Sequence, residues 1–175
     1  SLVVALYKHA DWTLIFSDGT ETLFCARWAC PREAALDLSA TSVVTRIVAQ
    51  VKRDLAPHPG ATEQGLLHLS RLLVEVNALA RAEALLASME QGIAVWTVRA
   101  LVAQKRGQRA DARMFALRVV KADQRAISAL ALLARMALAD GDGPLARRWL
   151  ARWLEQDPFS AEARRLLGEL CAPRR

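Results

Sequence analysis

Few side chains of this sequence have the type and spacing that catalysis or metal binding requires. The three histidines, His9, His58 and His68, are far apart, and none has a cysteine or carboxylate neighbour at the spacing of metal ligands. Asp18 and Glu21 flank an expected hairpin turn, where acidic residues are common, so we do not interpret them as a catalytic pair. Phosphate-binding loops, dinucleotide fingerprints and serine-nucleophile motifs do not occur in the sequence. We therefore expect a non-enzymatic chain without a metal ion or cofactor.

Two of the three cysteines, Cys25 and Cys30, are separated by four residues. A C-x4-C spacing without a second pair is weak evidence for metal or redox chemistry, and an odd number of cysteines does not make a disulfide framework. We interpret Cys25 and Cys30 as small apolar residues beside a hairpin. The sequence leaves open whether they pair with each other.

The composition indicates an ordered chain with a basic surface. Apolar residues make up 53% of the 175 residues, and 24 Lys and Arg against 18 Asp and Glu give a net charge of 24 − 18 = +6. This charge permits acidic partners without requiring them. The most apolar run, 129–134, ends at Arg135 and is far shorter than the about 20 residues of a membrane span. Because the sequence begins with Ser1, we expect it to be part of a longer protein that reaches a membrane only through segments outside this sequence.

The elements that must position any functional residue follow a repeat of 34 residues, since 134 − 100 = 34 and 168 − 134 = 34. This step relates Ala100 to Ala134 and Gly168, and it relates Gly107 to Gly141. Small residues let paired helices approach closely, and the glycines permit the left-handed turn that ends each first helix. The best copy of the repeat contains, in order, Leu130, Leu133, Ala134, Ala137, Gly141, Ala146, Leu150 and Pro158.

The repeat is less regular towards the N-terminus. An upstream helix pair begins near Glu63, but Ala82 and Ala112 are only 30 residues apart, so we expect its second helix or the next loop to be shorter by 34 − 30 = 4 residues. The last unit ends after one helix, 161–172, whose charged outer face is typical of a terminal cap. A further amphipathic helix at 41–56 is expected to form an N-terminal cap.

This period and its order of bulky, small, glycine and proline positions resemble the tetratricopeptide repeat. The resemblance covers about residues 61–172. It implies a mainly α fold, a right-handed α-solenoid of helix pairs, with about three repeats and a capping helix across 61–175. A short β-hairpin over 1–30 and a linker with the N-terminal capping helix over 31–60 complete the expected organisation.

The resemblance also implies a concave groove, lined by the first helix of each pair, in which a protein or peptide binds. Arg71, Lys105 and Arg135 could bind carboxylates of an extended peptide there. Leu67 and Thr97 stand where the chaperone-binding carboxylate-clamp subgroup has polar residues, so that subgroup is not indicated. The residues expected to face the groove are Gln64, Leu67, Arg71, Glu75, Thr97, Leu101, Gln104, Lys105, Ser128, Arg135 and Leu138.

The stretch 12–27 differs from the helical remainder. Trp12, Leu14 and Phe16 alternate with β-branched residues, and Asp18-Gly19 is a strong hairpin signal. The pattern W-x-L-I-F-x-D-G-x-x-x-L-F-x-A-R is similar to the closing hairpin of the soluble region of bacterial membrane glycosyltransferase-like proteins. That resemblance implies that the hairpin is the cut end of a larger sheet. We therefore expect two copies of the chain to form a homodimer through its unpaired edge and its aromatic residues.

Two interpretations of function follow. The first is a non-enzymatic scaffold that binds a protein or peptide, as the soluble part of a bacterial envelope protein concerned with glycan or polysaccharide assembly, with a cytoplasmic location as the alternative. The second is an accessory soluble domain of a membrane-bound glycosyltransferase. Nucleic-acid binding is not expected, because the basic residues point around the helices and no series of aromatic residues accompanies them. These basic residues are Arg99, Lys105, Arg106, Arg109, Arg113, Arg118 and Lys121.

Overall fold

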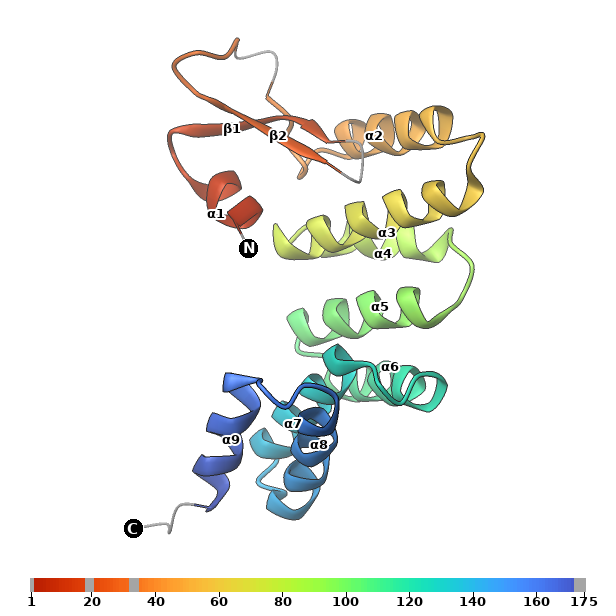
Figure 1. Cartoon of the computed structure of the whole chain (residues 1–175). Coiled ribbons are helices and arrows are strands. Elements are labelled where there is room, and N and C mark those ends of the chain that lie inside the picture. Colours follow the sequence, from red (N-terminus) through yellow and green to blue (C-terminus); the bar gives the residue numbers. More distant parts are fainter. Residues whose placement is uncertain (1, 18–20, 32–34, 172–175) are drawn as a thin grey trace. The chain divides into compact units, whose positions relative to one another are not determined.

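The structure, a computed structural model, describes residues 2–17, 21–31 and 35–171. These residues form nine helices and a two-stranded antiparallel hairpin, so the chain is mainly helical, as the sequence predicts (Figure 1). The chain divides into two compact units, Ser1–Glu90 and Gln91–Arg175. The boundary between them falls inside the segment that the repeat pattern assigns to one array.

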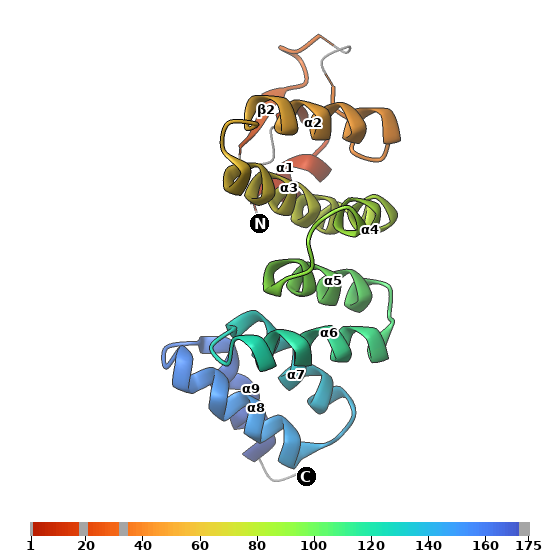
Figure 2. The same ribbon diagram turned by 90° about the vertical axis from the view of Figure 1, so that its right-hand side faces the viewer.

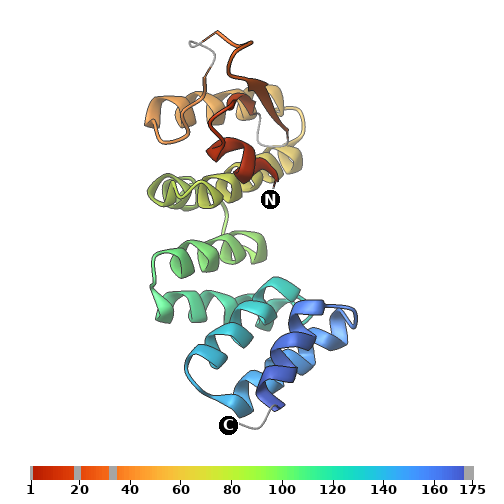
Figure 3. The ribbon, with the colours of Figure 1, turned by 90° about the vertical axis from the view of Figure 1, so that its left-hand side faces the viewer.

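The first unit combines the hairpin with four helices. α3 contacts both α2 and α4 (Figure 2), and α1 contacts both strands of the hairpin (Figure 3). The elements of this unit are α1 (Leu2–Lys8), β1 (Trp12–Ser17), β2 (Thr22–Ala26), α2 (Thr41–Asp54), α3 (Pro59–Glu75) and α4 (Leu79–Ala87).

The hairpin contains an irregularity that the sequence pattern does not reveal. Leu14 lies opposite Phe24, whereas Phe16 lies opposite Leu23, so Ile15 is an extra residue that forms a β-bulge. The two apolar residues on either side of the bulge differ in burial, since Leu14 is 3% exposed and Phe16 is 36% exposed.

The segment that follows the hairpin folds back onto it. The backbone N–H of Leu36 donates a hydrogen bond to the carbonyl of Leu14 (2.8 Å), so this segment covers one backbone group of β1. The Tyr7 hydroxyl accepts from the Leu38 N–H (3.2 Å), and burial raises the pKa of Tyr7 despite the lowering effect of this bond. The expected Asp18-Gly19 turn lies outside the described residues.

Cys25 and Cys30 form a disulfide, with their Cα atoms 6.1 Å apart. A turn brings them together, because the N–H of Ala29 donates to the carbonyl of Ala26 (2.8 Å). The interpretation of these cysteines as small apolar residues is therefore wrong. The disulfide closes a short loop whose Trp28 side chain is 88% exposed.

In the second unit, the described residues form helices and no strand. α6 contacts both α5 and α7, α7 packs on α8, and α9 packs on α8 (Figure 1). The elements of this unit are α5 (Ile93–Lys105), α6 (Arg109–Ala122), α7 (Ile127–Ala139), α8 (Gly143–Gln156) and α9 (Ala161–Cys171).

The turns within the pairs α3–α4, α5–α6 and α7–α8 share one geometry. Each contains a residue in the left-handed conformation, with φ of 66° at Asn77, 72° at Gly107 and 74° at Gly141. In each turn, the N–H of the next residue donates to a carbonyl near the end of the first helix. These bonds run from Ala78 to Leu73 (2.7 Å), from Gln108 to Ala103 (2.9 Å) and from Asp142 to Ala137 (3.0 Å). The prediction of a left-handed turn at both glycines is confirmed.

Small and large residues alternate in the core of the second unit. Leu130 and Leu150 are fully buried, and Trp153 is 4% exposed. The small residues expected at helix contacts are all buried, which allows the close helix approach that their size predicts. These residues are Ala100, Ala103, Ala112, Ala134, Ala137 and Ala146.

Candidate peptide-binding surfaces

On α3, the residues expected to face a groove divide into two groups. Gln64, Arg71 and Glu75 are exposed, and their spacing places them on one side of the helix. Leu67 is only 8% exposed, so its side chain contributes to packing rather than to a ligand surface. Among the described residues, the Arg71 guanidinium has no hydrogen-bond or carboxylate partner.

On α5, the residues expected to face the groove differ in their burial and in whether their polar groups are hydrogen-bonded. The Thr97 hydroxyl donates to the carbonyl of Ile93 in its own helix (2.7 Å), so it is already satisfied. Leu101 is half-buried, while Gln104 and Lys105 are exposed in the last turn. Neither of the last two side chains has a partner within the part of the chain that the structure describes. The end of α5 therefore presents an apolar side chain beside unused polar groups.

On α7, Ser128 is exposed, and Leu138 is partly buried against the core of the second unit. α5 and α7 belong to the same unit and contact each other. We use the name first-helix surface for the expected groove residues of these two helices that remain available, which are Leu101, Gln104, Lys105, Ser128 and Leu138. The expected groove residues of α3 belong to the other unit.

Arg135 of α7 has a different role from the one that the sequence suggests. Its Nε donates to Glu162 Oε1 (2.8 Å), and its Nη2 donates to Glu162 Oε2 (3.1 Å). Its guanidinium also lies over the ring of Trp153, 5.9 Å from the centroid. The hydrogen bonds from Arg135 lower the pKa of Glu162. The carboxylate that Arg135 binds is thus supplied by α9, and the arginine fastens this last helix to α7.

A hollow of about 600 Å³ lies in the first unit beside the hairpin, lined among others by Tyr7, Trp12, Arg27 and Asp37. The Tyr7 hydroxyl is engaged by the backbone of the following segment. The Asp37 carboxylate accepts from the N–H of Ser39 (2.7 Å), and hydrogen bonding to Ser39 lowers the pKa of Asp37. Both side chains therefore serve the fold of this segment.

The outward side of α6 carries a surface that sequence reasoning missed. Met114 and Leu117 line a hollow of about 510 Å³. Their side chains are 39% and 43% exposed, respectively. Arg113, Arg118 and Lys121 line the same hollow. The expectation that the basic residues point around the helices is therefore wrong for these three, which gather on one side of α6. The signal was the four-residue spacing of Arg113 and Leu117, of Met114 and Arg118, and of Leu117 and Lys121, which places each pair on one face of the helix.

The described residues contain neither a membrane-spanning helix nor a cluster of metal-binding side chains. None of the described helices combines the length and apolar character needed to cross a bilayer. The same part of the chain contains no group of three or more His, Cys, Asp and Glu side chains that could hold a metal ion.

We compared the chain with protein-family models, with curated proteins and with solved structures, and none of the three comparisons gave a match.

Proposed function

We propose that the chain is a non-enzymatic scaffold that binds a protein or peptide segment on the first-helix surface of its second unit. The single observation that carries this proposal is the pair Gln104 and Lys105, exposed and unpartnered among the described residues beside the half-buried Leu101. In this proposal the helix pairs belong to a tetratricopeptide-type right-handed α-solenoid. The shared left-handed turn of the three pairs supports that assignment.

The chemistry of the first-helix surface fits an extended peptide. The Gln104 amide can donate to a peptide carbonyl and accept from a peptide N–H, and the Lys105 ammonium can pair with a carboxylate. Leu101 and Leu138 supply apolar contact for a side chain of the ligand. We leave Arg135 out of this surface, because two of its five N–H donors already bind Glu162 of the same unit.

The location that we propose is the bacterial envelope, and the Cys25–Cys30 disulfide supports it. Disulfides persist in oxidising compartments such as the periplasm and are rare where thiols are kept reduced. The alternative function, an accessory domain of a membrane-bound glycosyltransferase, rests on the hairpin sequence alone.

The test begins with selection of binding peptides from a random displayed library by the intact chain. The double variant Gln104→Ala/Lys105→Glu should weaken binding of the selected peptides at least about tenfold, because it removes a hydrogen-bonding amide and reverses a charge. The matched control is Arg147→Glu, which reverses an exposed charge on α8. Peptides that bind the double variant and the unmodified chain equally would show that the first-helix surface is not the binding site.

A further inference from the structure

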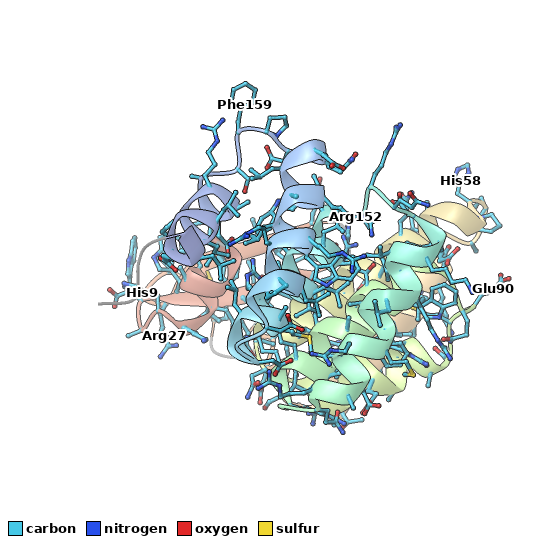
Figure 4. All side chains as sticks on the ribbon, turned by 90° about the horizontal axis from the view of Figure 1, so that it is seen from below. His9, Arg27, His58, Glu90, Arg152 and Phe159 are labelled. Carbon is cyan, nitrogen blue, oxygen red and sulfur yellow. A yellow bond between two sulfur atoms is a disulfide. The ribbon has the colours of Figure 1, made fainter. Side chains whose placement is uncertain are left out.

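The α6 surface, defined by Met114, Leu117, Arg113, Arg118 and Lys121, has an apolar centre and a basic rim. Met114 and Leu117 are three residues apart on one face of the helix and are both exposed by more than a third. A second hollow, of about 430 Å³, also contains Leu117 and Lys121, and Arg152 of α8 lines it. The Arg152 side chain extends from α8 beside α6 (Figure 4).

The charged side chains that line the two hollows are all basic. The residues that line the two hollows include four cations and no carboxylate. Asp140 already binds Arg113, and the Arg152 guanidinium stacks on Trp149, 5.3 Å from the ring centroid. Arg118 and Lys121 have no partner among the described residues. The unused positive charge of the surface is therefore concentrated on the last two turns of α6.

We infer that the α6 surface binds an acidic amphipathic helix of a partner protein. Such a helix would insert an apolar side chain against Met114 and Leu117 and place carboxylates against Arg118 and Lys121. The two hollows follow the axis of α6 and share Leu117 and Lys121, which suits successive apolar residues on one face of a helical ligand. This binding site is separate from the first-helix surface.

Charge complementarity alone would also admit nucleic acid or an anionic lipid surface, but the shape and composition of the surface favour the acidic helix. Nucleic-acid binding without sequence preference uses aromatic side chains on which bases stack, and no aromatic residue lines either hollow. A lipid surface is bound by apolar side chains that project into it. Here Met114 and Leu117 are less than half exposed and line a shallow hollow together with the basic side chains, which suits a side chain inserted by the partner.

The probe is a fluorescein-labelled synthetic helix of about 14 residues, roughly four turns, with leucines on one face and glutamates on the flanks. A peptide of the same composition with the leucines scattered around the helix is its control. Fluorescence anisotropy with the intact chain should show saturable binding of the first peptide, weakened by added salt, and much weaker binding of the second.

Two variants locate the binding site. Arg118→Glu/Lys121→Glu should weaken binding of the amphipathic peptide at least about tenfold, because two charge-assisted contacts become repulsive. Leu117→Gln, which keeps the size of the side chain, should weaken it without a change in salt dependence. The matched control, Arg147→Glu/Arg164→Glu, makes the same change of net charge elsewhere in the second unit and should bind normally.

Several results would overturn the inference. Equal binding of the scattered peptide would exclude recognition of an amphipathic face. Loss of binding in the Gln104→Ala/Lys105→Glu variant, but not in Arg118→Glu/Lys121→Glu, would move the binding to the first-helix surface and leave the proposed function standing. Tighter binding of single-stranded DNA or of phosphatidylserine vesicles, lost in the α6 variant, would assign the surface to nucleic acid or membrane instead.

Discussion

The pair α3–α4 and the two later pairs make the same turn from different residues and lead into second helices of different length. Asn77 takes the left-handed position that Gly107 and Gly141 hold in the later pairs. α4 has nine residues, whereas α6 and α8 have 14 each. The same backbone hydrogen bonds thus define the turn in all three pairs. The length of the second helix depends instead on its packing against the neighbouring helices.

The same comparison extends to the buried residue seven positions before the left-handed residue. Ala100 and Ala134 occupy this position in the later pairs, and Ser70 occupies it in the first, and all three are buried. The Ser70 hydroxyl donates to the carbonyl of Leu66 in its own helix (2.8 Å). A hydroxyl can therefore replace a hydrogen at this buried position because a carbonyl of its own helix accepts its hydrogen bond.

The largest effect is expected from Ala134→Leu, which adds bulk to this buried position. Ala134 is fully buried, and overpacking a buried site costs about 1–3 kcal/mol. Urea unfolding followed by far-UV circular dichroism measures the loss. An unchanged unfolding midpoint would show that Ala134 does not lie at a tight helix contact.

The next effect concerns the left-handed turn. Gly141→Ala should lower the free energy of unfolding by about 1–2 kcal/mol, because a side chain disfavours this conformation. A Cβ at Gly141 would meet no atom within 4 Å, so crowding contributes nothing. The reciprocal change Asn77→Gly should stabilise by less than about 1 kcal/mol. Destabilisation in the second case would mean that the Asn77 side chain itself supports the turn.

Substitutions of Arg71 and Arg135, which occupy corresponding positions in their helix pairs, should have smaller effects on stability that differ from each other. Arg135→Gln should lower the free energy of unfolding by up to about 1 kcal/mol, because it removes the ion pair with the half-exposed Glu162. Arg71→Gln should have no effect, since Arg71 has no partner among the described residues. Equal effects of the two substitutions would contradict this assignment.

The Arg135 contribution should depend on pH. The folded pKa of Glu162 is lowered, so its stabilising effect is fully present above the ordinary glutamate pKa of about 4.3 and is lost as the pH falls through the lower folded value. The difference between Arg135→Gln and the unmodified chain should therefore shrink in acid. Urea titrations at neutral and acidic pH measure this difference.

The smallest effect is expected from Ser70→Ala. The Ser70 hydroxyl returns to a carbonyl of its own helix, an arrangement that slightly disfavours the helix, and alanine has the higher helix propensity. The free energy of unfolding should change by less than about 0.5 kcal/mol. A loss of more than this would show that the hydroxyl has a further role in packing.

Local features of this fold were predictable from the sequence because they depend on spacing along the chain. The helix expected at 41–56 is α2, Thr41–Asp54, and the missing residues upstream of Ala112 correspond to the short α4. The left-handed turns at Gly107 and Gly141 were predictable because glycine adopts this conformation without a steric penalty. Each of these features depends on residues that are close together in the sequence.

Features that depend on register or on distant contacts were not predictable. The bulge at Ile15 appears only once β1 and β2 are paired, and Arg135 meets Glu162 across 27 residues of sequence. The second hollow, beside the α6 surface, could not be predicted without the knowledge that Arg152 of α8 lies beside α6. Spacing identifies the faces of one helix, but packing decides which of these faces stays exposed.

The turn at Asn77 also affects how the chain ages chemically. An asparagine deamidates when the backbone nitrogen of the next residue attacks its side-chain carbonyl carbon and closes a five-membered ring. Here that nitrogen belongs to Ala78, and its N–H is held by the carbonyl of Leu73 at 2.7 Å. The nitrogen must break this bond before it can attack, so the hydrogen bond that fixes the turn also slows the conversion of Asn77 to aspartate.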